Sequence, residues 1–105
     1  MMARYDVYRN PSKASAGRIP FLLDLQSDLL SHLNTRVVAP LVKARAFGAP
    51  AKRLNPVLTV NGAAVVLSPA QLAAVPTKVL GAPVANLAGH SNEIIAALDL
   101  LFTGY

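Results

Sequence analysis

The clearest structural signal in the sequence is the segment Val57-Leu58-Thr59-Val60-Asn61-Gly62-Ala63-Ala64-Val65-Val66-Leu67. Two runs rich in apolar and β-branched residues, 57–60 and 63–67, flank the dipeptide Asn61-Gly62. Asn-Gly favours a type I′ turn, because both turn residues tolerate positive φ and the turn's twist matches that of the flanking strands. The segment therefore predicts a β-hairpin, and with it a fold built largely from β-strands.

Shorter β-prone runs lie on both sides of this hairpin. Residues 4–9 predict a first strand, and the Ser- and Gly-containing residues 10–17 predict the loop that follows it. Residues 21–25 and 36–42 predict two further strands, and residues 77–80 predict a last short one. Because proline has no N–H to donate to a sheet, we expect Pro40 at a sheet edge, a bulge or a bend.

The C-terminal residues change from a strand-like to a helical period. At about 100° per residue, the apolar side chains around Leu98 form one stripe. A helix from about Ser91 to Phe102 is expected, with Ser91 or Asn92 as its N-cap and Gly104 as its stop. Leu100 points away from the stripe, so we expect it on the surface, whereas Phe102 is expected in the core. The stripe consists of Ile94, Ile95, Leu98, Leu101 and Phe102, and the opposite face of Asn92, Ala96, Asp99 and Thr103.

Length and composition indicate one domain spanning residues 1–105. Hydrophobic residues make up 53% of the chain and charged residues 14%, which excludes a disordered chain because such chains lack apolar surface to bury. A chain this short leaves part of that apolar surface exposed, so we expect self-association. The chain has no cysteine, which excludes disulfides and thiolate metal sites.

Neither the first ten residues nor the longest uncharged stretch resembles an export or membrane segment. Arg4, Asp6 and Arg9 interrupt the first ten residues, which excludes the continuous apolar run of a secretory signal. Prolines and polar residues interrupt the longest uncharged stretch, residues 54–77, too densely for a membrane helix. We therefore expect a cytoplasmic protein that has no membrane partner.

The formal net charge of +5 is concentrated in the first half, because nine of the ten basic residues lie at or before Arg53. Such a balance suits either nucleic acid or an acidic protein partner. There is no Trp and there are only three Phe and three Tyr, so no stacking platform for single-stranded nucleic acid is evident. The charge alone leaves both kinds of partner open.

No residue pattern predicts catalysis, a metal site or a cofactor. His32 and His90 have no further ligand at metal-binding spacing. Ser27, Asp28 and His32 contain the groups of a catalytic triad, but their closeness in sequence favours a solvated turn. An acid–base set of Arg45, His32 and Asp24 for RNA cleavage would need the fold to bring three distant residues together. The isolated glycines 81, 89 and 104 do not form a phosphate-binding loop.

Several ordered motifs resemble the CcdB family of toxins over nearly the whole chain. Only the loop between Lys13 and Pro20 looks longer than in that family. The motifs are Asp24-Leu25-Gln26-Ser27-Asp28-Leu29-Leu30, Arg36-Val37-Val38-Ala39-Pro40-Leu41, Asn55-Pro56-Val57-Leu58, Ala74-Val75-Pro76, Val84-Ala85-Asn86-Leu87 and Leu100-Leu101-Phe102-Thr103-Gly104-Tyr105.

This resemblance implies a fold and a mode of action. The fold is an SH3-like antiparallel barrel with a C-terminal helix, shared with the MazF and Kid toxins, in a homodimer. CcdB-like toxins bind the A subunit of DNA gyrase and trap the cleaved-DNA complex without catalysing a reaction. A CcdA-like antitoxin with an acidic, disordered segment neutralises them, and DNA is bound only indirectly, through the toxin–antitoxin complex.

The resemblance also implies which residues contact gyrase. Thr103 stands where the family has a Trp, and Asp99 where an Asn is typical; Tyr105 is a possible replacement ring. Two alternatives stay open, a CcdB-fold protein that binds antitoxin but has lost gyrase poisoning, and a MazF-like endoribonuclease. The implied gyrase-binding residues are Leu29, Leu30, Asp99, Phe102, Thr103, Gly104 and Tyr105.

Overall fold

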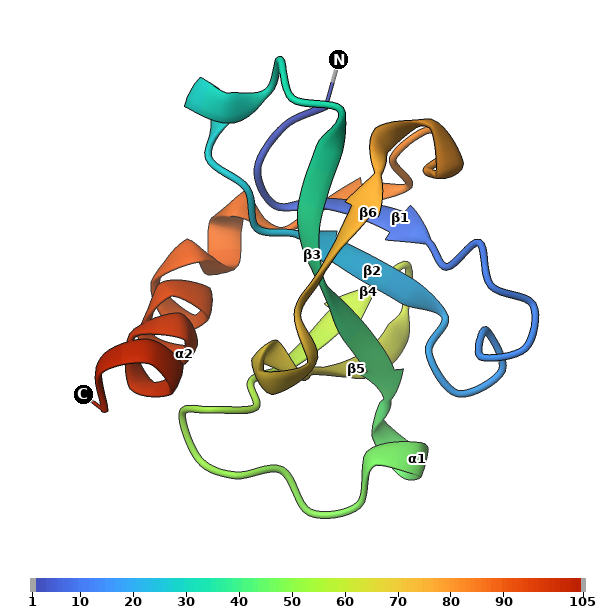
Figure 1. The fold of residues 1–105 in the computed structure, drawn as a ribbon. Helices are drawn as coiled ribbons and strands as arrows, with labels where there is room; N and C mark the ends of the chain where they lie inside the picture. Colours follow the sequence, from blue (N-terminus) through green and yellow to red (C-terminus); the bar gives the residue numbers. More distant parts are fainter. Residues whose placement is uncertain (1, 105) are drawn as a thin grey trace.

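The structure is a computed structural model that describes residues 2–104, and it shows an antiparallel, nearly closed β-barrel with a C-terminal helix. The expected SH3-like barrel and helix are confirmed (Figure 1). Within these residues the strands pair in the order β4-β5-β3-β2-β1-β7, and β6 also pairs with β3. The strands are β1 (Asp6–Arg9), β2 (Phe21–Asp24), β3 (Thr35–Lys43), β4 (Val57–Val60), β5 (Ala63–Leu67), β6 (Ala73–Pro76) and β7 (Ala85–Asn86).

The hairpin expected from Asn61-Gly62 is present. Val60 pairs with Ala63 across the turn, and Asn61 and Gly62 have φ values of 49° and 83°. Two successive positive φ values are those of a type I′ turn. The most local signal in the sequence thus sets the register of β4 against β5.

Strand β3 is the centre of the barrel because it pairs with three other strands. It lies beside β2 on one side, and on the other side beside β6 along its first half and β5 along its second. Pro40 lies between the β6-paired residues and the β5-paired residues, and its carbonyl accepts a hydrogen bond of 3.0 Å from Ser68 N. The expected sheet edge for Pro40 is therefore wrong: proline occurs at the change of partner, where a missing N–H interrupts neither ladder.

Two strands differ from their predicted positions. The first begins at Asp6 rather than at residue 4, because Tyr5 has a φ of 72°. Residues 77–79 form a 3₁₀ turn, η3 (Thr77–Val79), and the strand expected there lies before it as β6. Pro76 is opposite Thr35, the first residue of β3, and a single further bond, from Thr77 N to Asn34 O at 2.8 Å, follows before the chain turns into η3.

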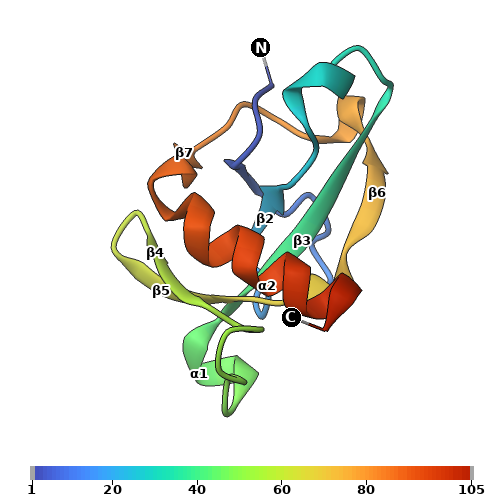
Figure 2. The same cartoon turned by 90° about the vertical axis from the view of Figure 1, so that its left-hand side faces the viewer.

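The C-terminal helix α2 (Ser91–Thr103) covers one side of the barrel, as Figures 1 and 2 show from two directions. His90 is its N-cap rather than Ser91 or Asn92, because a 3₁₀ turn leads directly into it. Gly104 ends the helix as expected, in the left-handed conformation. The remaining helical turns are η1 (Asp28–Leu30), α1 (Ala44–Phe47), η2 (Pro69–Gln71) and η4 (Ala88–His90).

The face of α2 that packs on the barrel is rotated from the predicted stripe. Ile94 and Ala97 are fully buried, whereas Ile95 and Phe102 are exposed. Because the Ala97 side chain is small, the helix can approach the barrel closely on the side of Ala97. Ile95 and Phe102, on the other side of the apolar stripe, are then turned toward solvent. Leu100, expected on the surface, is half-buried.

The barrel interior holds the hydrophobic core. Its buried side chains come from β1 to β5, from the segment after β7 and from Ile94 of α2, and Leu98 packs against them. The three neighbouring strands β1, β2 and β3 each contribute a side chain with no exposed area, Val7, Leu23 and Leu41. Burial of this kind contributes about 1.5–3 kcal/mol per large apolar side chain.

Candidate functional site

Two groups of exposed apolar residues stand out on the surface. Leu29 and Leu30 in η1 are 87% and 45% exposed, and Phe102 near the end of α2 is 68% exposed. Large side chains left in water at these levels are typical of a surface that another molecule covers. All three are among the residues that the sequence resemblance singles out.

The polar residues just before η1 hold this turn in place. Ser27 Oγ accepts a 3.2 Å hydrogen bond from Leu29 N and so caps the turn. The Asp28 carboxylate accepts a 2.8 Å bond from Arg4 N and ties the turn to the start of β1. These contacts fix the backbone from which Leu29 and Leu30 project.

Gln26 connects the turn to the barrel. Its side-chain amide donates to Leu30 O at 2.8 Å, and its side-chain carbonyl accepts from Val37 N at 3.0 Å. Gln26 is only 6% exposed, so both bonds are shielded from competing water. The Gln therefore takes the place of a missing backbone ladder between η1 and β3.

Beneath Gln26 lies a fully buried ion pair between Asp24 and Arg36. Arg36 Nε and Nη2 both lie 2.7 Å from Asp24 Oδ2, and both side chains are 0% exposed. Burial raises the pKa of the Asp24 carboxyl, while the Gln26 N–H and the Arg36 guanidinium oppose that rise. Arg36 is permanently charged, so a pair this close keeps Asp24 ionised and holds the end of β2 to β3.

A second buried carboxylate lies beside Tyr8. Asp6 Oδ1 accepts from the Asn86 side chain at 2.9 Å, and Asp6 Oδ2 is 3.4 Å from Tyr8 Oη. Burial, reinforced by the charges of Asp6 and Asp24, raises the pKa of Tyr8 from 10.0 to about 12. Tyr8 therefore stays neutral, and its hydroxyl lies beside the Asp6 carboxylate of the same strand.

The end of α2 is organised differently. Phe102 is not in the core, so the core position expected for it is wrong. Thr103 Oγ1 donates a 2.6 Å bond back to Asp99 O, and Gly104 N donates to Leu100 O at 3.1 Å. Gly104 has a φ of 81°, a conformation that other residues adopt only with strain. Bonds local to the last turn of α2 therefore direct this end of the chain.

The two groups do not meet within one protomer. In both Figure 1 and Figure 2, η1 lies at one end of the barrel, and the last turn of α2 lies well below it. Asp99, Phe102, Thr103 and Gly104 share the end of α2. Tyr105 lies outside the described residues. A single face that contains both groups would need a second copy of the chain.

The catalytic sets considered from the sequence are not assembled. Asp24 is buried against Arg36, and His32 and Arg45 lie beyond opposite ends of the nine-residue strand β3. Ser27 and Asp28 bond to backbone N–H groups of η1 and β1, not to His32. Among residues 2–104 no group of three or more potential metal ligands is present. In the same range, no helix is long and apolar enough to cross a membrane.

Sequence reasoning missed two residues of this region. No acidic residue in β3 indicates that Arg36 forms a buried ion pair. Its one signal is that it lies in phase with the apolar Val38 and Val42, which are buried on the face of β3 opposite to Ala39 and Leu41 of the core. Ile95 lies seven residues before Phe102 and is 38% exposed, so it extends the apolar flank of α2 by two turns.

These features define a small β-barrel protein with a covering C-terminal helix and with exposed apolar side chains at η1 and at the end of α2. A comparison with protein families then gives its family: the family model described as "CcdB protein" matches residues 4–104. The chain therefore belongs to the CcdB family, whose members are non-enzymatic toxins of toxin–antitoxin systems.

Proposed function

We propose that this protein poisons DNA gyrase in the cytoplasm, by binding the A subunit and trapping the complex in which the DNA is cleaved. Its residues do not catalyse the making or breaking of a covalent bond. They stabilise one state of the gyrase–DNA complex by binding to it. The observation that carries the proposal is the exposure of Leu29 and Phe102, two residues for which the resemblance to the CcdB family implies gyrase contacts.

A homodimer is part of this proposal. The turn η1, which carries Leu29 and Leu30, lies apart from the last turn of α2 in both views, so one continuous contact surface needs residues from two copies. Sedimentation by analytical ultracentrifugation at micromolar concentration is expected to give a dimer. A monomer under those conditions would contradict this part of the proposal.

We further propose that a CcdA-like antitoxin neutralises the dimer through an acidic, disordered segment. The formal charge of +5 supports this pairing, because opposite charge speeds encounter with an acidic chain. A segment that folds on binding needs an extended surface to compensate for its ordering entropy. In this arrangement the antitoxin holds the operator DNA for the toxin–antitoxin complex.

The test is a cleavage assay with purified protein, DNA gyrase, ATP and supercoiled plasmid. After denaturation of gyrase, linear DNA is expected, and it is expected to disappear when the antitoxin is added. Leu29→Ser is expected to reduce the linear product strongly, whereas Val57→Ser, at another exposed apolar position, is expected to retain it. No linear product from folded, dimeric protein would refute gyrase poisoning.

One observation favours a second candidate function, an antitoxin-binding protein that no longer poisons gyrase. Thr103 turns its hydroxyl back to Asp99 O, so it offers neither an aromatic ring nor a free hydroxyl at the position of the family's Trp. Thr103→Trp distinguishes the candidates: linear DNA with Thr103→Trp alone would identify the wild-type protein as this second kind. The ribonuclease alternative has no assembled acid–base pair to support it.

A further inference from the structure

Five basic side chains gather at the end of the barrel opposite to η1, in a region we call the basic end. The β1–β2 loop, the last residues of β3 and the short helix α1 form it, and Figure 1 shows these segments on the side of the barrel away from α2. Lys43 is half-buried and the other four residues are exposed. The members of the basic end are Arg9, Lys13, Arg18, Lys43 and Arg45.

Strand pairing places these residues close together. Lys43 N donates a 2.9 Å hydrogen bond to Arg18 O, so the loop lies directly against the end of β3. Arg9 pairs with Phe21, which pairs with Leu41, two residues before Lys43. With strands about 4.8 Å apart and about 3.3 Å per residue, the Cα atoms of Arg9 and Lys43 are roughly 12 Å apart.

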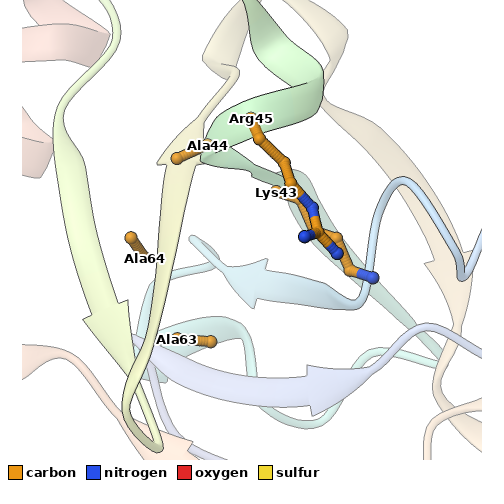
Figure 3. A pocket seen from close by; sticks show the side chains of 5 residues that line it. All are labelled: Lys43, Ala44, Arg45, Ala63 and Ala64. Atoms are coloured by element: carbon orange, nitrogen blue, oxygen red, sulfur yellow. The ribbon is translucent and has the colours of Figure 1, made fainter.

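A shallow pocket of about 310 Å³ lies where the end of β3 and the start of α1 meet the hairpin. Lys43, Ala44 and Arg45 line it on one side, and Ala63 and Ala64 of the hairpin line it on the other. Figure 3 shows the Lys43 and Arg45 side chains extending in the same direction, to one side of the three small alanines. Two neighbouring cations that extend the same way suit an anionic group such as a phosphate.

No acidic side chain neutralises the basic end. Within residues 2–104, none of its five cations forms an ion pair. The acidic side chains lie elsewhere. Asp6 and Asp24 are buried, and Asp28, in η1, accepts a hydrogen bond from Arg4 N. Glu93 and Asp99 lie on α2. The cations therefore repel one another until an external anion screens them.

We propose that the basic end binds the phosphate backbone of double-stranded DNA directly and without sequence preference. The Cα atoms of Arg9 and Lys43 alone are about 12 Å apart, and a duplex carries one charge per about 1.7 Å of axis, so several phosphates face the patch at once. The direct contact goes beyond the indirect one expected from the family. It does not depend on gyrase binding.

The residue types at the basic end favour DNA over an acidic peptide. A peptide that folds on binding needs large apolar or aromatic anchors, and protein–DNA interfaces are more polar and more positive. Among residues 2–104, six of the seven large exposed apolar side chains lie in or near η1, in η3 or on α2, and the seventh, Val57, is on β4. The pocket itself offers alanines, which anchor a peptide poorly.

The experiment measures fluorescence anisotropy of a labelled 20-base-pair duplex, titrated with the protein alone at 25 to 150 mM NaCl. Five phosphate contacts would give a slope of log K against log salt concentration near −4.5, at about −0.9 per contact. Arg45→Gln is expected to reduce the slope by about one and weaken binding at 50 mM salt about tenfold. Lys78→Gln removes one equally exposed charge from η3 and is the matched control; it should leave the slope unchanged.

The results of this titration distinguish binding of duplex DNA from binding of an acidic polypeptide. No binding at 25 mM NaCl, or an equal loss with Lys78→Gln, would overturn it. Polyglutamate that displaces the duplex at far lower charge concentration would assign the patch to an acidic polypeptide instead. Because gyrase is absent from this assay, a protein that fails to poison gyrase can still pass it.

Discussion

The turn at η1 and the end of α2 both expose apolar side chains, but they are held in place in different ways. Buried polar side chains fix η1: Gln26 bridges it to β3, and the Asp24–Arg36 pair lies below. The end of α2 depends on the bonds that Thr103 Oγ1 and Gly104 N donate within its last turn and on the Gly104 conformation, and Phe102 is 68% exposed. Buried polar side chains can thus stabilise a turn whose neighbouring apolar side chains stay exposed.

The largest expected effect comes from breaking the ion pair below η1. Arg36→Met leaves the Asp24 carboxylate buried without its partner, and the free energy of unfolding should fall by about 3–5 kcal/mol. Urea unfolding followed by circular dichroism measures this change. The double variant Asp24→Asn/Arg36→Met should lose much less than the sum of both single variants. Additive losses would mean that the pair does not act as a unit.

Tyr8 gives the same region a dependence on alkaline pH. Its pKa is raised from 10.0 to about 12, so the folded protein holds the proton more tightly than the unfolded chain. The stability that this provides is complete below pH 10 and is lost as pH rises through 12, by about 3 kcal/mol. Urea midpoints of wild type and Tyr8→Phe at pH 9 and pH 11.5 measure it. Identical pH dependence in both proteins would refute the assignment to Tyr8.

At the other region, Phe102→Ala should change binding and not stability. Truncating an exposed aromatic anchor typically weakens a protein complex by about 2 kcal/mol, or about thirtyfold. Calorimetric titration with the gyrase A subunit measures the affinity, and urea unfolding should shift by less than about 0.5 kcal/mol. If Phe102→Ala unfolded as readily as a core variant, the contrast between the two regions would be wrong.

The smallest expected effect concerns the cap of η1. Ser27→Ala removes the bond to Leu29 N and should lower stability by about 0.5–1 kcal/mol. Ser31→Ala, in the same turn but without a side-chain bond to it among the described residues, is the control. Equal effects of both substitutions on the urea midpoint would show that the Ser27 hydroxyl contributes nothing.

Local signals in the sequence were sufficient for much of the fold. Asn61-Gly62 predicts its hairpin because both residues tolerate positive φ, and Gly104 predicts the helix end for the same reason. The predictions that failed depend on partners distant in sequence. Residues 77–79 leave the sheet only because β3 ends at Thr35, and no pattern around 77–80 contains that information.

The same distinction applies to the candidate site. The motif resemblance identifies Leu29 and Phe102, which are exposed as a contact surface requires. It does not reveal the Asp24–Arg36 pair, because the two residues are twelve positions apart and meet only across β2 and β3. The helical spacing of apolar residues predicts Phe102 in the core, and this prediction is wrong. The spacing identifies the apolar face of α2, but it does not give the rotation of the helix that places Ala97 against the barrel.

The pairing of β3 with three other strands should also protect its amides from hydrogen exchange. Amides near the middle of β3 are enclosed by β2 on one side and by β6 or β5 on the other, so they should exchange only when the whole barrel unfolds. The η1 amides belong to a three-residue turn outside the sheet and should exchange through local opening. The barrel is thus expected to stay closed when η1 opens locally.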